Sequence, residues 1–166
     1  VVCMELSAHA IYYKKADFQF DIAVFTNCSP EHLDFFEDYN EYKQVKISAF
    51  DRSKAKVAVV NADDVTGKEI LCLRNQGVIS YGLDDPCDIF AIDFYEDNRG
   101  ISFLINLFDE LYEIKSRYHG KYNVYNMLAV ACTCALAGVN TDFIAKYLSL
   151  ADYIPGRMQK VCNKIK

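Results

Sequence analysis

The sequence has no long run of Lys or Arg, and its formal net charge is -5. A surface that binds a nucleic-acid polymer needs concentrated positive charge, so such a polymer is not the expected partner, although a single nucleotide is compatible. The chain also lacks an apolar stretch of the roughly 20 residues that span a membrane. It does not begin with a charged segment followed by an apolar one, as a secretory signal would. We therefore expect no membrane partner and a cytoplasmic location.

Paired C-x-x-C spacing is also absent, although the chain has seven cysteines. Zinc sites usually show that spacing, and an odd number of cysteines does not complete a disulfide framework. Most of these cysteines lie within apolar runs, where a small reduced core residue is the expected role. A reducing compartment fits this pattern.

The apolar pattern predicts an α/β fold. With 166 residues, of which 52% are hydrophobic and 25% charged, the chain can bury one core, and we expect a single domain. Residues 21–26 and 56–60 are apolar without alternation, which is typical of parallel strands covered on both faces. Residues 1–4 have the same character, and a buried strand is expected there too. Alternation at 101–107 predicts a small antiparallel extension.

Polar side chains follow two of these expected strands. Glu5, Ser7 and His9 come after the first, and Asn27 and His32 come after the second. In open α/β sheets, ligands bind at the carboxyl ends of the strands, so a shared site is possible. The structural alternative is that Glu5 and Ser7 cap the following helix while His9 packs against apolar neighbours.

Lys46 lies on an expected helix over residues 38–50. Tyr42 precedes it by four residues, so the lysine shares the inward stripe of that helix. A lysine in this place commonly packs its stem and extends its ammonium into water. The alternative is a lysine whose pKa is lowered by burial, because a neutral amine could take up carbon dioxide and become a metal-binding carbamate.

Further polar residues mark the later helices. Asp63 and Asp64 are expected to cap a helix over 65–75. Asn123 and Asn126 share a face in the first turn of a long helix that is apolar nearly all round and therefore expected to be buried. The two carboxamides suit a purine edge, or one of them could be a cap. Arg157 lies in a turn and suits a phosphate or a carboxylate.

Taken in order, six short segments resemble the Mur ligase family over almost the whole chain. They are residues 5–10, 25–27 with 32–34, 42–46, 61–64, 120–126 and 155–158. The sequence Glu-Leu-Ser-Ala-His-Ala at 5–10 favours the MurE-type branch of the family and its central ATP-binding domain. The resemblance implies a mostly parallel sheet with flanking helices, similar to P-loop NTPases, plus an antiparallel extension.

The resemblance also implies roles for particular residues. It places magnesium ligands at Glu5 and His32, with a carbamylated Lys46 that supports a second magnesium ion. It assigns nucleotide contacts to Asn27, Asn123, Asn126 and Arg157, and contacts to the UDP-muramoyl peptide to Ser7, His9 and Lys15. Lys15 stands where many relatives have arginine, so the chain departs from the family pattern at this position.

The implied reaction is an ATP-dependent ligation in peptidoglycan precursor synthesis. ATP phosphorylates a carboxylate of UDP-N-acetylmuramoyl-L-alanyl-D-glutamate, and a diamino acid then displaces phosphate. The phosphate-binding G-x-x-G-K-[ST] pattern does not occur in these residues, and we expect it upstream, together with an N-terminal UDP-binding domain. A C-terminal domain that selects the amino acid is also expected elsewhere, so these residues alone should not ligate. Alternatives are a cyanophycin or folylpolyglutamate synthetase-like ligase, and a non-catalytic nucleotide-binding module.

Overall fold

The computed structural model describes residues 1–15, 18–30, 35–151 and 154. Contacts within the chain divide it into two compact units, Val1–Asp88 and Ile89–Lys166. The expectation that the whole chain forms a single domain remains a prediction. Among the helices of the described residues, none is both long and apolar enough to cross a bilayer.

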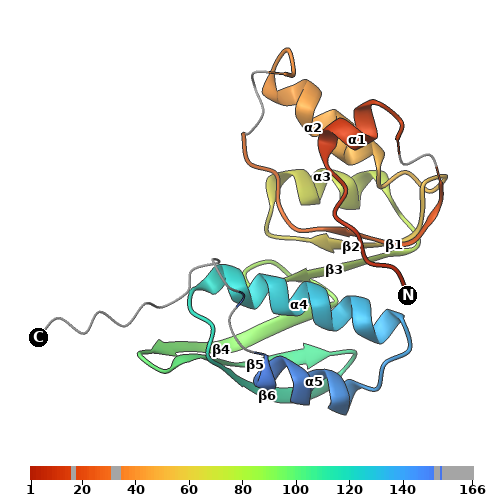
Figure 1. The fold of residues 1–166 in the computed structure, drawn as a ribbon. Coiled ribbons are helices and arrows are strands. Elements are labelled where there is room, and N and C mark those ends of the chain that lie inside the picture. The colour runs from red at the N-terminus through yellow and green to blue at the C-terminus, as the bar shows by residue number, and fades with distance from the viewer. Residues whose placement is uncertain (16–17, 31–34, 152–153, 155–166) are drawn as a thin grey trace, which may run out of the picture. The chain divides into compact units, whose positions relative to one another are not determined.

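The first unit contains a parallel sheet with helices beside it. Its strands pair in the order β1, β2, β3, and Figure 1 shows the helices on one side of β1 and β2. The elements are α1 (Ala8–Tyr12), β1 (Phe20–Phe25), α2 (Tyr39–Ser48), β2 (Ala55–Asn61), α3 (Val65–Leu73) and β3 (Val78–Gly82). The predicted parallel strands and the predicted helix over 38–50 are confirmed.

Consecutive apolar residues explain why these strands lie inside the unit. Ala58, Val59 and Val60 on β2 are all fully buried. Successive side chains of a strand point to opposite faces, so both faces of β2 are covered. Phe25 of β1 and Ile70 of α3 belong to the same core as Ala58 and Val60.

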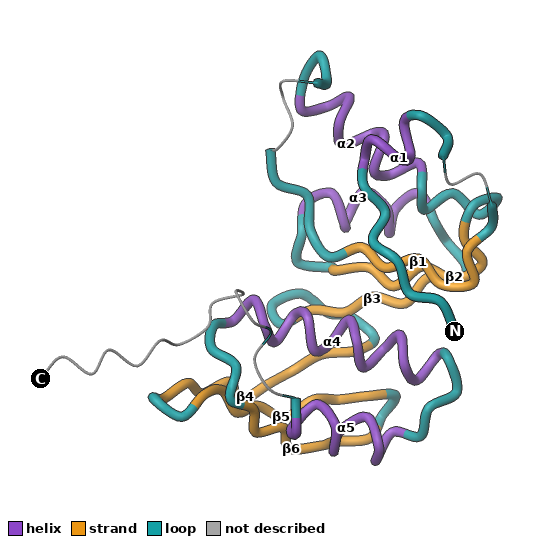
Figure 2. The backbone as a smooth tube through the Cα atoms, viewed as in Figure 1, coloured by secondary structure: helices purple, strands orange, loops and turns teal. Residues whose placement is uncertain are grey.

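The strand predicted at residues 1–4 is wrong. Figure 2 shows the segment before α1 as loop, and Val1 and Val2 are exposed. A strand is stabilised by hydrogen bonds to a neighbouring strand, and apolar sequence alone does not supply that neighbour. In the structure, β1 pairs with β2, and no strand pairing includes residues 1–4 among those described.

The second unit is an antiparallel sheet with two helices. Its elements are β4 (Ile89–Asp97), β5 (Gly100–Leu107), β6 (Glu110–Ser116), α4 (Lys121–Leu136) and α5 (Thr141–Leu150). Helix α4 packs against β4 and β5, α5 packs against β6, and the two helices contact each other (Figure 1). Alternate β5 residues Ile101, Phe103 and Ile105 are buried, which confirms the predicted antiparallel extension.

Two predictions about burial need correction. Helix α4 is not buried all round, because Tyr122 and Val130 lie on an exposed stripe while residues such as Leu128 are buried. It packs against the sheet with one side only. The expected core role of the cysteines holds for Cys28 and Cys132 but is wrong for Cys3 and Cys72, which are exposed.

Candidate functional site

The loop that follows β1 is held at four consecutive backbone carbonyls. Each accepts a hydrogen bond from a side chain of α2, β2 or β3, and a carbonyl paired in this way is fixed in direction. The pairs are Tyr81 Oη to Phe25 O at 3.0 Å, Asn61 Nδ2 to Thr26 O at 2.8 Å, Lys46 Nζ to Asn27 O at 3.1 Å and Tyr39 Oη to Cys28 O at 2.9 Å. The carboxyl end of β1 is therefore a rigid edge.

Burial raises the pKa of the Tyr39 phenol. The phenol therefore stays protonated at neutral pH and can donate to the Cys28 carbonyl. The Cys28 carbonyl oxygen can only accept a hydrogen bond, so the Tyr39 hydroxyl must keep its proton to bind it.

Lys46 turns its amine toward this edge. Besides the Asn27 carbonyl, Nζ donates to Tyr42 Oη at 3.4 Å, and it lies 5.3 Å from the centroid of the Tyr42 ring. Tyr42 is buried, whereas Lys46 is half-buried. The structure thus brings together Lys46 and Asn27, two of the residues singled out from the sequence, and gives the lysine amine polar partners at a strand end.

Glu5, Ser7 and His9 lie at the start of α1, which packs against α2. Ser7 Oγ accepts the Ala10 amide at 3.2 Å and caps the helix. The His9 ring lies 4.3 Å from the Phe35 ring, between centroids. For these contacts of Ser7 and His9 the structural alternative is confirmed, and Glu5 is exposed. Their metal and substrate roles stay predictions.

Two predicted site residues, His32 and Arg157, lie outside the described residues. Lys15 is exposed, with its Nζ 5.6 Å from the centroid of the Tyr13 ring. Within the part of the chain that the structure describes, no group of three or more His, Cys, Asp or Glu could hold a metal ion. The predicted magnesium site therefore depends on His32 and on modification of Lys46.

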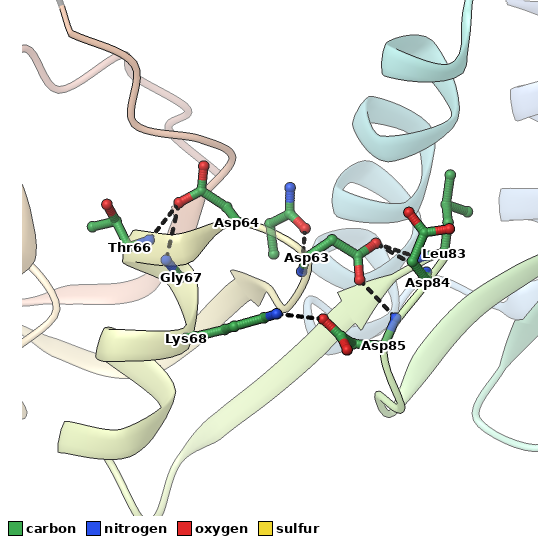
Figure 3. Close-up of polar contacts among 9 residues, drawn as sticks. Asp63, Asp64, Thr66, Gly67, Lys68, Leu83, Asp84 and Asp85 are labelled. Carbon is green, nitrogen blue, oxygen red and sulfur yellow. Dashed lines mark hydrogen bonds and ion pairs between the residues drawn. The ribbon is translucent and has the colours of Figure 1, made fainter.

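Asp64 points toward the first turn of α3, whereas Asp63 points toward the loop after β3 (Figure 3). Asp64 caps α3 as predicted, since Oδ1 accepts the amides of Thr66 at 2.8 Å and Gly67 at 3.1 Å. Its Oδ2 accepts the amide of Cys28 at 3.2 Å, which ties α3 to the loop after β1.

Asp63 was also predicted to cap α3, and that is wrong. Its carboxylate accepts three successive amides after β3, those of Leu83 at 2.6 Å, Asp84 at 3.2 Å and Asp85 at 2.8 Å. Lys68 completes the arrangement with an ion pair to Asp85 at 2.7 Å. Adjacent carboxylates thus fix the loops after β1 and β3, and the sequence carried no signal for the direction of Asp63.

Asn123 and Asn126 lie together at the start of α4, as predicted. Asn126 Nδ2 donates to Asn123 Oδ1 at 3.4 Å, and Asn123 Nδ2 donates to His119 O at 2.7 Å. Neither side chain caps the helix, whose N-cap is Gly120 with a φ of 86°. Asn126 is exposed and Asn123 half-buried, so the pair presents one carboxamide to solvent.

A cavity of about 480 Å³ lies elsewhere in the first unit. Phe20, the first residue of β1, contributes to its lining, whereas Asn27 follows the carboxyl end of that strand. Lys14 and Lys54 supply positive charge and Asp51 negative charge. The cavity is thus at the amino end of the strand, and it does not include the residues predicted to form the site.

A family model described as Mur ligase middle domain matches residues 1–134. The chain belongs to the Mur ligase family. Over 159 residues it is 32% identical to the UDP-N-acetylmuramoyl-L-alanyl-D-glutamate--2,6-diaminopimelate ligase of Clostridium botulinum. That match covers 95% of this chain and 32% of the relative, so the chain spans about a third of that relative's length.

Solved structures of Mur ligases share the fold. The structure of a UDP-N-acetylmuramoyl-L-alanyl-D-glutamate--2,6-diaminopimelate ligase superposes with a TM-score of 0.85 at 24% identity, over 96% of this chain and 34% of that one. A MurF ligase of Thermotoga maritima, crystallised with ADP, gives 0.67 at 22% identity, over 90% of this chain and 34% of that chain. At these identities the likeness establishes the fold.

Sequence reasoning missed most of the residues that build the edge. Tyr39 and Tyr81 are among the residues that the sequence analysis did not single out. Their hydroxyls reach backbone carbonyls 11 and 56 residues away. A buried tyrosine needs a hydrogen-bond partner, and this requirement is the signal that could have marked both residues.

Proposed function

We propose that the chain is part of the central domain of an ATP-dependent amide ligase. The ligase would add a diamino acid to UDP-N-acetylmuramoyl-L-alanyl-D-glutamate in the cytoplasm. Family membership supports this proposal, and the observation that carries it is the Lys46 amine held at the carboxyl end of β1, 3.1 Å from Asn27 O. In α/β proteins this end of a strand is where ligands bind.

The reaction has two balanced steps. A carboxylate oxygen of the D-glutamate side chain attacks the γ-phosphorus of ATP, giving an acyl phosphate and ADP. The amine of the diamino acid then attacks the acyl carbon, phosphate leaves, and the nitrogen loses a proton to form the amide. The relatives are named for 2,6-diaminopimelate, and we propose the same amino acid here.

Two of the three proposed ligands, the Glu5 carboxylate and a Lys46 carbamate, would offer the oxygen donors that magnesium prefers. Glu5 offers an exposed carboxylate, which hard cations prefer. An ammonium cannot bind a cation, but a neutral lysine amine adds carbon dioxide and releases a proton, leaving a carbamate. Magnesium held by Glu5, His32 and that carbamate would neutralise charge on the transferring phosphoryl group.

The observed contacts of Lys46 are compatible with this modification. The ammonium donates to both Asn27 O and Tyr42 Oη. A carbamate nitrogen keeps one N–H, so it can still donate to one of the two acceptors while its new oxygens face a cation. The rigid loop after β1 would therefore continue to orient Lys46 after modification.

The second unit would supply the contacts to the nucleotide base. Asn126 uses one N–H toward Asn123, which leaves its other N–H and its oxygen for a purine edge. Arg157 would bind phosphate or ribose oxygens. Ser7, His9 and Lys15 would contact the UDP-muramoyl peptide, and Lys15 is an exposed cation suited to an anionic group.

Replacing Lys46 tests the proposal. In the full-length protein, Lys46→Ala should lower the ligation rate by about 100-fold or more, because the metal loses an anionic support. A short-chain carboxylic acid should partly restore the rate by standing in for the carbamate. The measurement is phosphate release that depends on the diamino acid.

Lys43→Ala is the matched control on the same helix. Lys43 donates to Glu69 of α3 at 2.8 Å, so its amine has a different partner from the amine of Lys46. Its replacement should leave ligation within about twofold, as expected for an ion pair near the surface. Unchanged turnover in Lys46→Ala would remove the lysine from the site.

A further inference from the structure

Glu96 holds the segment that leads into α4. It is the next-to-last residue of β4. Its Oε1 accepts the backbone amide of Gly120 at 3.1 Å and lies 3.2 Å from Nδ1 of His119. Both side chains are about one-third exposed, 36% for Glu96 and 32% for His119. One carboxylate oxygen thus binds two successive residues before the helix.

A β-bulge decides that Glu96 faces this segment. Before the bulge, Ala91 pairs with Ile105, and after it Glu96 pairs with Ile101. Directly opposed residues lie on the same face of a sheet, and Ile101 and Ile105 both belong to the buried face that α4 covers. The extra residue between Ile92 and Tyr95 switches the alternation. Without it, Glu96 would lie on the opposite face.

The same contact continues to the two asparagines. His119 O accepts Nδ2 of Asn123, and Asn123 Oδ1 accepts Nδ2 of Asn126. A continuous series of hydrogen bonds therefore runs from Glu96 through the 119–120 backbone to the exposed carboxamide of Asn126. The orientation of the Asn123 carboxamide is therefore linked to the position of the His119 carbonyl.

We propose that Glu96 is a positioning residue that sets Asn123 and Asn126 for the purine ring of the nucleotide. This inference rests on the proposed nucleotide role of the two asparagines. Gly120, the N-cap of α4, has a φ of 86°, and no capping side chain holds it. Because glycine adopts a wide range of backbone angles, the start of α4 is weakly restrained by its own sequence. The Glu96 carboxylate restrains that entry and also complements the positive end of the helix dipole.

The test compares Glu96→Ala with Glu113→Ala in the full-length protein. Glu113 is a surface carboxylate of β6 that pairs with Lys115 at 2.8 Å, so it serves as the matched control. Glu96→Ala should raise the KM for ATP by about 5- to 10-fold and leave kcat within about twofold, because a binding contact is misplaced while the chemistry is unchanged. Glu113→Ala should change neither.

The preference for ATP over GTP is a second measurement. It should not change if Glu96 only stabilises the fold. The ratio of kcat/KM for ATP to that for GTP should fall about fivefold in Glu96→Ala, because misplaced carboxamides no longer favour adenine. Glu96→Gln keeps an acceptor oxygen for Gly120 N and should restore most of the ratio. Glu96→Thr introduces a residue that favours strands but whose side chain is too short to reach Gly120. This variant replaces Glu96→Ala in the test if Glu96→Ala does not fold.

Asn123→Ala and Asn126→Ala separate the two ways the test can fail. If both raise the KM for ATP while Glu96→Ala and Glu96→Thr leave the KM and the ATP preference unchanged, the positioning role of Glu96 is overturned and the proposed function stands. If neither asparagine variant affects the KM or the preference, the nucleotide role fails and the inference fails with it.

Discussion

The two units position their proposed site residues in different ways. In the first, the loop after β1 is bound by Tyr39 and Lys46 of α2, Asn61 of β2 and Tyr81 of β3. In the second, the entry to α4 depends on the single carboxylate of Glu96. Four side chains from three elements hold the Lys46 edge, whereas both contacts of Glu96 at the entry to α4 come from one carboxylate, which leaves the asparagine pair more open to adjustment. Substitutions should therefore have larger consequences in the first unit.

The largest difference is expected between two arginines. Arg74, only 3% exposed, donates to four backbone carbonyls, those of Phe50, Ala55, Lys56 and Gly77. Arg74→Met should lower the local free energy of unfolding by about 3 kcal/mol or more, because buried carbonyls lose their partners. Hydrogen exchange of the β2 amides, followed by mass spectrometry in the full-length protein, measures this effect.

Arg99 of the second unit is the matched control. Its side chain is 87% exposed and pairs with Asp97 at 2.8 Å at the β4–β5 turn. Arg99→Met should leave the exchange rates of the β4 and β5 amides within about twofold, because an exposed ion pair contributes little to stability. Equal effects of the two substitutions would contradict the contrast between the units.

A smaller difference is expected between two helix caps. Asp64 caps α3 and also accepts the Cys28 amide, whereas Asn140 accepts only the amides of Asp142 and Phe143 at the start of α5. Asp64→Ala should cost about 2 kcal/mol and Asn140→Ala about 1 kcal/mol, since the first loses an additional charged hydrogen bond. Exchange of the first-turn amides in each helix gives both values.

The exchange of the Cys28 amide sharpens this comparison. The exchange rate should rise in Asp64→Ala and stay unchanged in Asn140→Ala. Of these two capping residues, Asp64 is the one that binds the Cys28 amide. If the Cys28 amide kept its protection in Asp64→Ala, the carboxylate would be a helix cap and nothing more.

The last prediction concerns Cys87, a thiol in the loop between β3 and β4. Burial, together with the carboxylates of Asp63, Asp88 and Asp85, raises the pKa of Cys87 to about 11. The thiolate is the reactive form, so at pH 8 alkylation should be about 100-fold slower than for a thiol of pKa 9 with equal access. The rate should rise with pH until the pH passes about 11.

Alkylation by iodoacetamide at several pH values, read by mass spectrometry, tests this expectation. Asp63→Asn removes one negative charge and weakens the hold on residues 83–85. Both effects should speed alkylation of Cys87. An alkylation rate as high in the unsubstituted protein as in Asp63→Asn would show that the loop is not held by this carboxylate.

Local patterns in the sequence predicted most of the secondary structure. The apolar run of β2 and the alternation of β5 identified parallel and antiparallel strands, and both were confirmed. Capping residues such as Asp64 also marked a helix start correctly. Apolar character misled at residues 1–4, because a strand forms only where another strand offers its hydrogen-bonding edge.

The candidate site was only partly accessible from the sequence. Lys46 and Asn27 were both singled out, and the structure brings them together. The side chains that hold their loop were not, because a tyrosine or asparagine gives no local sign of which distant carbonyl it will reach. The arrangement of Glu5 with His32 stays a prediction, since His32 lies outside the described residues.

The sequence by itself determined the family, the succession of strands and helices, and the residue types available for binding a nucleotide and a cation. Only the tertiary structure decided that Asp63 turns to the loop after β3, that Lys46 donates to Asn27, and that a bulge turns Glu96 toward α4. Periodicity and capping act over a few neighbouring residues and can be read locally. Contacts between distant segments depend on strand register and helix packing, where one extra residue reverses the face of a side chain.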